Sequence, residues 1–133
     1  MNIRKTALRL FMAFTLLLVL AFCVNAHAQG KSQMVRLAKI QIDSAQLESY
    51  KTALEEEIET SVRVEPGVLT LYAVYEKNNP THIMILEIYA DTIAYKAHLQ
   101  TPHFIKYKSG TKDMVKSLEL VPAVPLVPGM KIK

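Results

Sequence analysis

The chain has 133 residues, and its 16 lysine and arginine residues outnumber its 12 aspartate and glutamate residues. Three of the basic residues, Arg4, Lys5 and Arg9, precede a long apolar run, so residues 29–133 hold 13 basic and 12 acidic groups. This near-neutral balance argues against nucleic-acid binding. The single cysteine, Cys23, lies in the same N-terminal segment, so the remaining 105 residues exclude disulfides, cysteine nucleophiles and thiolate metal sites.

The first 28 residues have the three parts of a secretory signal peptide. A basic start is followed by apolar residues from position 10 to 24 and by an Ala-x-Ala site that ends at Ala28. The apolar run is shorter than the roughly 20 residues that cross a bilayer as a helix. We therefore expect cleavage after Ala28 and export of the remainder to the periplasm or the medium, free of the membrane. An uncleaved anchor and lipidation of Cys23 are the alternatives, and Phe22 disfavours the second because a lipoprotein signal has a small residue there.

Local periodicity predicts a strand and a long helix at the start of the exported part. Residues 34–42 alternate apolar and polar side chains, which is typical of a strand with one buried face. Asp43 or Ser44 can cap the amphipathic helix that follows, whose apolar stripe is Leu47, Tyr50, Leu54 and Ile58. The acidic run at 55–57 falls in this helix, and we interpret it as a solvated polar face rather than a cation site.

The middle of the chain predicts two strands. Glu65-Pro66-Gly67 ends the helix, because proline cannot continue a helix and glycine admits a positive φ. Residues 68–75 are rich in β-branched and aromatic side chains and predict a strand. After a hairpin-like connection at 78–80, residues 82–90 are mostly apolar on both faces, which indicates a central strand.

Helical segments and a last strand complete the pattern. Asp91 or Thr92 can cap a helix at 93–99 that breaks near Thr101-Pro102, and residues 103–111 form a further helical stretch. Residues 117–121 predict the final strand. The tail at 122–133 holds three prolines and a glycine and is predicted to be extended.

The order of these elements predicts an α+β fold of the ferredoxin-like, split βαβ type. In that fold a four-stranded antiparallel sheet carries both helices on one face. We expect one domain over residues 29–121, followed by the tail. Because the strands are apolar, the other face of the sheet needs a cover, and we expect a homodimer that packs sheet to sheet.

Three segments of the chain resemble a known family. They are Glu65-Pro66-Gly67-Val68-Leu69, then Leu86-Glu87-Ile88-Tyr89-Ala90-Asp91, then the run from Ala94 to Phe104. Together they resemble the antibiotic biosynthesis monooxygenase domain, and within it the quinol monooxygenase branch. The resemblance covers roughly residues 34–121.

This resemblance implies a dimeric α/β-barrel protein with a mostly apolar pocket in each subunit. The better-studied members oxidise phenols or quinols with O2 and need no metal or flavin, so the implied function is a cofactor-independent monooxygenase acting on a small aromatic or quinol-like substrate. Relatives that share the fold leave two alternatives, a non-catalytic binding module for a hydrophobic or quinone-like ligand and a small-molecule isomerase. Heme degradation is disfavoured, because those relatives use a tryptophan and this chain has none. Export is a departure, since the quinol monooxygenase branch is usually cytoplasmic.

His98 is the first candidate for catalysis. It lies four residues after Ala94 and three after Tyr95, so the three share one helix face, and in the family pattern this histidine points into the pocket. An imidazole can deprotonate a phenol or hold an oxyanion. Glu87 is the one charge in its strand and can orient His98, with Tyr89 on the same strand face. For both His98 and Glu87, a purely structural contact is the alternative.

The remaining site candidates are aromatic or imidazole side chains expected at the pocket. They are Tyr72, Tyr95, His103 and Phe104, with ordinary core packing as the alternative for the tyrosines. No metal is expected, because His98 and His103 are five residues apart with a proline between them, whereas a helical zinc pair is spaced i, i+4.

Overall fold

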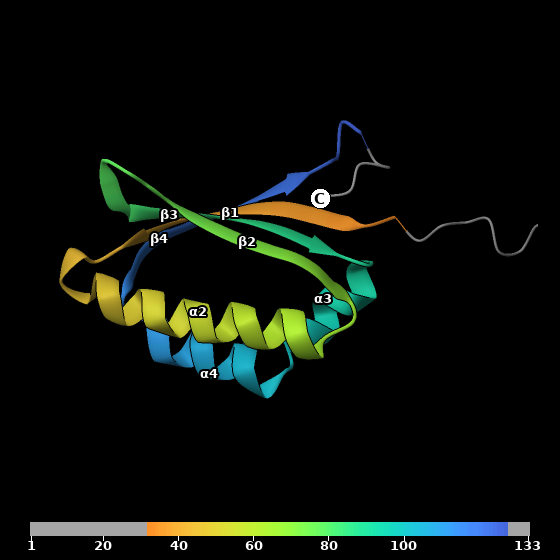
Figure 1. The fold of residues 1–133 in the computed structure, drawn as a ribbon, viewed down its shortest axis with the longest axis horizontal. Helices are drawn as coiled ribbons and strands as arrows, with labels where there is room; N and C mark the ends of the chain where they lie inside the picture. Colours follow the sequence, from red (N-terminus) through yellow and green to blue (C-terminus); the bar gives the residue numbers. More distant parts are fainter. Residues whose placement is uncertain (1–31, 128–133) are drawn as a thin grey trace, which may run out of the picture. The chain divides into compact units, whose positions relative to one another are not determined.

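Strands and helices make up most of residues 32–127, the part of the chain that this computed structural model describes (Figure 1). The elements are β1 (Met34–Ile42), the 3-10 turn η1 (Ser44–Gln46), α2 (Leu47–Val64), β2 (Val68–Glu76), β3 (Asn79–Tyr89), α3 (Thr92–His98), α4 (Pro102–Thr111) and β4 (Val115–Ala123). The predicted signal peptide at 1–28 and the end of the predicted tail lie outside the described residues. Within residues 32–127, none of the helices has the length and apolarity to span a membrane.

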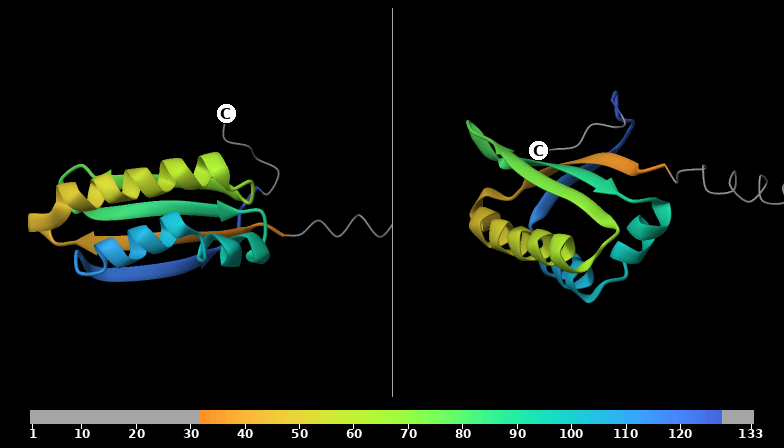
Figure 2. Two further views of the ribbon diagram at one scale, coloured as in Figure 1. Left: turned by 90° about the horizontal axis from the view of Figure 1, so that it is seen from below. Right: turned by 45° about the vertical axis from the view of Figure 1, so that its right-hand side comes forward.

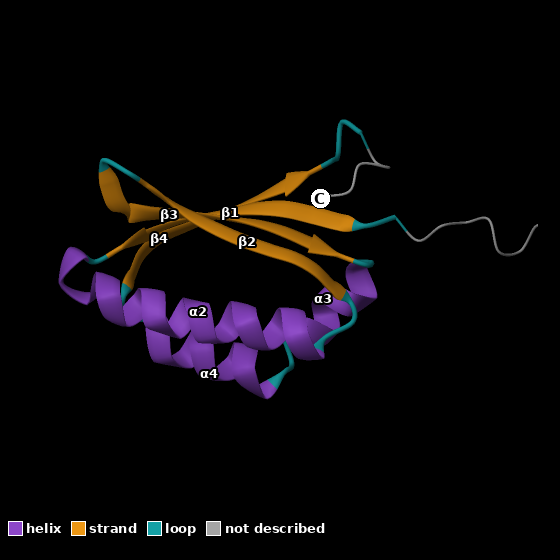
Figure 3. Ribbon diagram, in the orientation of Figure 1, coloured by secondary structure: helices purple, strands orange, loops and turns teal. Residues whose placement is uncertain are grey.

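The four strands form one antiparallel sheet in the order β2-β3-β1-β4. This is the strand order of the ferredoxin-like fold, so the predicted fold class is confirmed. β3 is central, as its apolar sequence indicated. The two long helices, α2 and α4, lie side by side against one face of the sheet, and α3 lies near the end of β3 (Figures 2 and 3).

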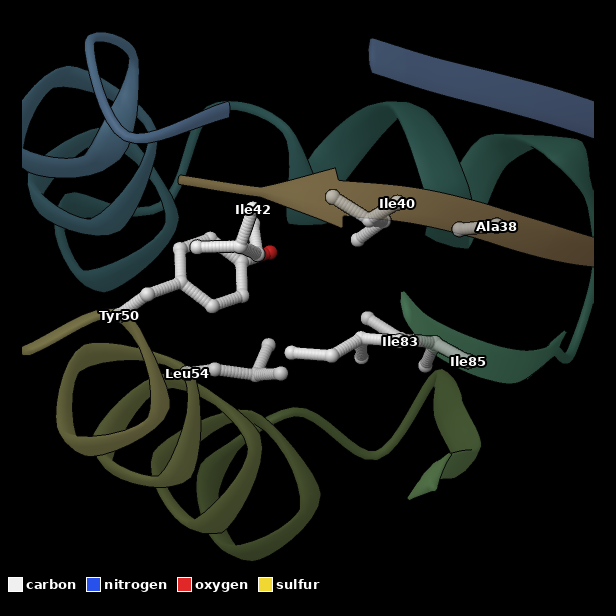
Figure 4. Packing of buried hydrophobic residues seen from close by; sticks show 7 residues of the cluster. All are labelled: Ala38, Ile40, Ile42, Tyr50, Leu54, Ile83 and Ile85. Carbon is white, nitrogen blue, oxygen red and sulfur yellow. The ribbon is translucent and has the colours of Figure 1, made fainter. Parts of the chain in front are cut away.

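The core fills the space between the sheet and α2. Ala38, Ile40 and Ile42 point from β1 toward the helices because alternate strand residues share a face. They meet Tyr50 and Leu54 of α2, with Ile83 and Ile85 of β3 completing the cluster (Figure 4). This cluster fixes α2 over the centre of the sheet.

The buried stripe of α2 differs from the predicted one. It consists of Tyr50, Leu54, Glu57 and Ser61, which recur at the i, i+4, i+7, i+11 spacing of one helix face. Glu55 and Glu56 are exposed as predicted, but Glu57 is only 5% exposed. Interpreting the whole acidic run as a solvated face was therefore wrong for Glu57, because its position in the helix period places it inward.

The turn at Glu65–Gly67 joins α2 to β2 and packs on α3. No glycine among residues 32–127 adopts a positive φ. The prediction that Gly67 is needed for a positive φ was therefore wrong. A Cβ atom at Gly67 would lie 2.5 Å from the Cβ of Ala94, so close packing is what requires glycine here. The Gly67 carbonyl also accepts a hydrogen bond of 2.9 Å from the Ala90 amide.

The last helices and strand match the predictions with shifted ends. The Asp91 side chain caps α3, and Pro102 is in the first turn of α4, where its missing N–H costs nothing. β3 begins at Asn79 rather than 82, because only Lys77 and Asn78 form the hairpin turn. β4 runs from Val115 to Ala123, so it takes in two residues of the predicted tail that pair with β1.

Candidate active site

A cavity of about 480 Å³ lies between the sheet and the helices. Its walls are mostly apolar, with residues from β1, α2, β3, α3, α4 and β4. Polar residues line it at several points, among them Arg36, Glu57, Glu87, His98 and several tyrosines. A largely apolar hollow of this size with a few convergent polar groups is typical of a site for a small organic molecule.

His98 is the last residue of α3, lines this cavity and is only 2% exposed. Its Nδ1 atom lies 3.0 Å from Oε1 of Glu65. Burial would raise the pKa of Glu65, but hydrogen bonds from His103 and His98 outweigh burial and hold that pKa below its ordinary value. Glu65 is therefore ionised at neutral pH and is the acceptor for an Nδ1–H group of His98. In a neutral imidazole with its hydrogen on Nδ1, Nε2 is the acceptor nitrogen.

Glu57 stands on the other side of the same imidazole. Its Oε1 atom lies 3.6 Å from Nε2 of His98 and accepts a 2.8 Å hydrogen bond from the Ser61 hydroxyl. Burial raises the pKa of Glu57 above its ordinary value. If His98 takes up a proton, the imidazolium lies between two carboxylates, and both stabilise its charge.

A second polar network adjoins His98. Glu87 accepts a 2.7 Å hydrogen bond from Nε of Arg36 and one of 2.9 Å from the Tyr89 hydroxyl. Arg36 also donates to the Tyr95 hydroxyl at 2.9 Å, and its guanidinium lies 4.5 Å from the centroid of the Tyr95 ring. This network holds the positive charge of Arg36 at the wall of the cavity. Burial, with the charge of Glu87 adding to it, raises the pKa of the Tyr89 phenol, so that phenol stays protonated.

Short-range interactions between α3 and α4 position the imidazoles. The Thr101 hydroxyl donates to the His98 carbonyl at 2.8 Å, and the Thr101 amide donates to the same carbonyl at 3.1 Å. Pro102 then starts α4 in a new direction, which brings Nε2 of His103 to 2.5 Å from Oε1 of Glu65. The ring of Phe104 packs 4.8 Å from that of His98, centroid to centroid. Because the chain changes direction between His98 and His103, both imidazoles contact the carboxylate of Glu65.

Several predicted residues meet at the cavity. His98, Glu87, Tyr89, Tyr95 and Phe104 all line it. Glu87, however, bonds to Arg36 and Tyr89, while Glu65 and Glu57 contact His98, so the predicted pairing of Glu87 with His98 is replaced by a different one.

Two predicted pocket residues lie elsewhere. Tyr72 is 64% exposed and sits on the face of β2 away from the helices, because its neighbour Leu71 takes the inward position and lines the cavity. Placing Tyr72 in the pocket was therefore wrong by one residue of strand register. His103 lies beside a smaller pocket of about 160 Å³ that it shares with Glu57.

Three important polar residues were missed, and two of them had a sequence signal. Arg36 shares the strand parity of Ala38, Ile40 and Ile42, which marks it as inward, and it lies opposite Glu87 in the β1–β3 register. Glu57 follows the helical stripe of Tyr50 and Leu54. Glu65 had no such signal, because only the tertiary contact of its turn with α3 brings it to His98.

Chemically, the site combines a buried base with an anion-stabilising network. Nε2 of His98 can accept a proton, and Arg36 supplies a nearby positive charge for a developing oxyanion. Glu65, His98 and His103 also bring their ligand atoms within 4.8 Å of one another. The i, i+4 spacing of a zinc pair applies to two histidines on one helix, whereas His98 belongs to α3 and His103 to α4.

Comparisons with known proteins agree with the fold. Residues 34–109 match the sequence profile of the family described as antibiotic biosynthesis monooxygenase. A crystal structure of a candidate antibiotic biosynthesis monooxygenase from Bacteriodes thetaiotaomicron VPI-5482 is 62% identical, with a TM-score of 0.76 over 77% of this chain and 97% of that one. A candidate monooxygenase from Lactobacillus acidophilus NCFM is 32% identical, with a TM-score of 0.69 over 71% of this chain and 45% of that one.

A more distant structure shares the fold alone. It is a candidate antibiotic biosynthesis monooxygenase from Nitrosomonas europaea, which is 22% identical, with a TM-score of 0.68 over 74% of this chain and 94% of that one. No curated protein matches the chain significantly. Because the family profile spans more than half of the sequence and a 62% identical relative shares the fold, the chain belongs to the antibiotic biosynthesis monooxygenase family.

Proposed function

We propose that this protein is a cofactor-independent monooxygenase that oxidises a quinol or polyphenol with O2. The observation that carries the proposal is the environment of His98, a buried imidazole at the wall of an apolar cavity with Nδ1 held by an ionised carboxylate. That hydrogen bond leaves Nε2, which lies 3.6 Å from Oε1 of Glu57, as the nitrogen available to a substrate. Glu65 takes the orienting role that the sequence suggested for Glu87.

The cavity fits an aromatic substrate. Its volume of about 480 Å³ lies within the range of small-molecule sites, and its mostly apolar walls would exclude water around a bound ring. In the proposed complex a phenolic hydroxyl donates to Nε2 of His98, and Arg36 stabilises the phenolate that forms. Tyr95 and Phe104 would contact the ring of the substrate.

The proposed reaction balances without a further reductant. The quinol dianion or monoanion is electron-rich and gives electrons to O2, one oxygen atom forms a new C–O bond and the other leaves as water. Overall, a quinol and O2 yield a hydroxyquinone and water. The protein supplies the base, the orientation and a dry enclosure.

An oxygen-electrode assay tests this proposal. A panel of hydroquinones and polyphenols should give enzyme-dependent oxygen uptake that falls about 10²–10⁴-fold in His98→Ala and in the closer-sized His98→Gln. His82→Ala is the matched control, because His82 lies on β3 outside the cavity, beside Glu76. Circular dichroism verifies that each variant is folded.

The outcomes separate the alternative functions. Saturable ligand binding without oxygen uptake over the whole panel would point to a binding module, and product formation under anaerobic conditions would point to an isomerase. Either result overturns the monooxygenase proposal.

The proposal includes export. The basic start, apolar run and Ala-x-Ala site of residues 1–28 support a periplasmic or secreted location. Mass spectrometry of the protein recovered from the exported fraction should give a chain that begins at Gln29. Recovery of the intact 133-residue chain from the cytosol would contradict it.

We also propose a homodimer in which two sheets pack face to face. The helices cover one face of the sheet, and a row of apolar side chains crosses the other, from Tyr72 of β2 through Leu86 and Leu37 to Val121 of β4. Tyr72 and Leu37 in this row are exposed in the single chain. An exposed apolar row of this extent on a central sheet favours a protein partner.

A further inference from the structure

Three potential metal ligands from three separate elements converge beside the cavity. Glu65 is the C-cap residue of α2, His98 ends α3 and His103 lies in the first turn of α4. Oε1 of Glu65 lies 3.0 Å from Nδ1 of His98 and 2.5 Å from Nε2 of His103. The three ligand atoms all lie within 4.8 Å of one another. Ligand atoms held about 2.0–2.2 Å from a tetrahedral metal are roughly 3.3 Å apart, so changes of no more than about 1.5 Å in these separations would accommodate an ion.

The types of these ligands suit a divalent transition ion. Two imidazoles and one carboxylate form a donor set that binds Zn²⁺ and related ions and leaves the remaining coordination positions open to water or an anion. Glu65 and His103 are partly exposed, with side-chain exposures of 13% and 18%, and provide a route of entry from solvent. The small pocket shared by His103 and Glu57 adjoins them.

Glu57 gives a second and independent observation. Metal-binding histidines commonly donate their other ring nitrogen to a carboxylate, which fixes the tautomer and increases the basicity of the ligand atom. Nε2 of His98 faces Oε1 of the buried Glu57 at 3.6 Å, and the Ser61 hydroxyl fixes that carboxylate at 2.8 Å. His98 is thus placed between a candidate metal position at Nδ1 and a supporting carboxylate at Nε2.

We propose that Glu65, His98 and His103 bind one divalent first-row transition-metal ion, for which Zn²⁺ is the probe. Binding replaces the hydrogen atoms that Nδ1 of His98 and Nε2 of His103 share with Glu65. Each neutral ring then carries its proton on the other nitrogen, which for His98 is Nε2 facing Glu57. The ion crosslinks the ends of α2, α3 and α4.

This site goes beyond the proposed function and opposes it in one respect. A His98 ring bound through Nδ1 presents an N–H group at Nε2 instead of a free acceptor. Metal occupancy and the proposed base role of His98 therefore exclude each other. The conflict with the base role rests on the proposed function, whereas the metal site itself rests on the geometry of the ligands.

Direct binding measurements test the site without any activity assay. Tag-free, chelator-treated protein is titrated with Zn²⁺ by calorimetry, in competition with a chromophoric chelator. We expect one Zn²⁺ per chain, at least about 100-fold weaker binding in His103→Gln, and about 10–100-fold weaker binding in Glu57→Gln. His82→Gln is the matched control and should bind as the wild type does, because His82 pairs with Glu76 elsewhere on the sheet.

Nuclear magnetic resonance of the wild-type protein keeps the test decisive if His103→Gln does not fold. Stoichiometric Zn²⁺ should shift the ring nitrogen resonances of His98 and His103 and leave those of His82 unchanged. The proposal is overturned by an absence of saturable binding, by equal affinity in His103→Gln and wild type, or by shifts confined to His82. A lack of oxygen uptake with quinols would affect the proposed function alone.

Discussion

The tautomer and orientation of the His98 ring depend on which carboxylate holds Nδ1. Glu65 accepts hydrogen bonds from both His98 and His103, and these bonds keep its pKa below the ordinary value despite burial. An ionised partner at Nδ1 fixes the tautomer and the orientation of the ring, as in other carboxylate–histidine pairs. Glu87 forms an ion pair with Arg36 instead.

Glu65→Gln therefore should lower the turnover number of the proposed oxidation by about 10²-fold, with a smaller change in KM. The amide keeps the shape of the side chain but removes the charge that holds Nδ1–H. Glu56→Gln is the matched control, because Glu56 is exposed on the same helix and pairs with Lys106. Oxygen uptake measures the rate, and nitrogen NMR of His98 should show a mixture of tautomers. An unchanged turnover number would remove Glu65 from the mechanism.

Arg36 and Glu87 form a buried cross-strand ion pair whose members depend on each other. Glu87→Ala should lower the free energy of unfolding by about 3–5 kcal/mol, because it leaves the guanidinium of Arg36 buried without a counter-charge. The double variant Arg36→Met/Glu87→Leu should recover most of that loss, since it removes both charges together. Urea denaturation of the two variants and the wild type gives the comparison. Additive losses in the double variant would contradict the coupling.

At the scale of elements, the turn that leads into β2 packs so closely on α3 that position 67 has no room for a side chain. Gly67→Ala should cost about 1–3 kcal/mol of unfolding free energy, because the new Cβ would lie 2.5 Å from the Cβ of Ala94. Adding Ala94→Gly should relieve the clash and restore part of the stability. Gly110→Ala in α4 is the control, where nothing lies within 4 Å and a gain of about 0.5–1 kcal/mol is expected. Thermal unfolding should give a lower melting temperature for Gly67→Ala and a higher one for Gly110→Ala than for the wild type.

α2 and α4 are joined by a hydroxyl pair, in which the oxygens of Tyr50 and Tyr107 lie 2.5 Å apart. Burial raises the pKa of Tyr50 from 10.0 to about 12. The unfolded chain ionises this phenol at lower pH than the folded chain, so its contribution is complete below about pH 10 and is lost as the pH rises toward 12, by up to about 2.7 kcal/mol.

Tyr50→Phe removes the phenol and should therefore remove the part of the pH dependence of stability that its ionisation causes. At neutral pH the variant should be less stable by about 1 kcal/mol, because Tyr107 loses its hydrogen-bond partner. Between pH 9 and roughly 11.5 its stability should fall less steeply than that of the wild type. Urea unfolding curves over this range measure the difference, and parallel pH profiles would contradict the raised pKa.

The elements could be predicted because their signals are local. Period-two alternation located β1, helical spacing located α2, and proline and glycine located the breaks. The errors came from side-chain parity and tertiary contact. Tyr72 was placed in the pocket where Leu71 lies, and Glu57 was taken as solvated although its spacing from Tyr50 and Leu54 places it inward.

The partner of His98 could not be predicted by the same means. Glu65 and His98 are 33 residues apart, and they meet where the turn at Gly67 packs closely against Ala94 of α3. The pairing of Arg36 with Glu87 likewise requires the register of β1 against β3, which no single-strand pattern specifies. The fold therefore follows from local patterns, whereas the polar network of the site follows from how those elements pack.

At the scale of the whole molecule, the proposed homodimer uses the sheet face that the helices leave uncovered. Val74, Met84, Lys39 and Glu119 form a second row across the four strands, next to the apolar row of Tyr72, Leu86, Leu37 and Val121. Lys39 and Glu119 already pair at 3.2 Å. A sheet-to-sheet dimer would bury the apolar row together with Val74 and Met84 beside it, and would leave the charged pair of Lys39 and Glu119 toward its border.

Met84→Glu tests this assembly without weakening the single chain. Met84 is 38% exposed and lies directly opposite Lys39, so a glutamate there gains a cross-strand ion pair in the monomer. In the proposed dimer the same change brings a new charge from each subunit into the interface, and the dissociation constant should rise by at least about 100-fold. Val62→Glu is the control, because Val62 is exposed on α2, on the opposite side of the sheet. Sedimentation velocity should show a dimer for the wild type and Val62→Glu and a monomer for Met84→Glu, and a dimer in all three would place the interface elsewhere.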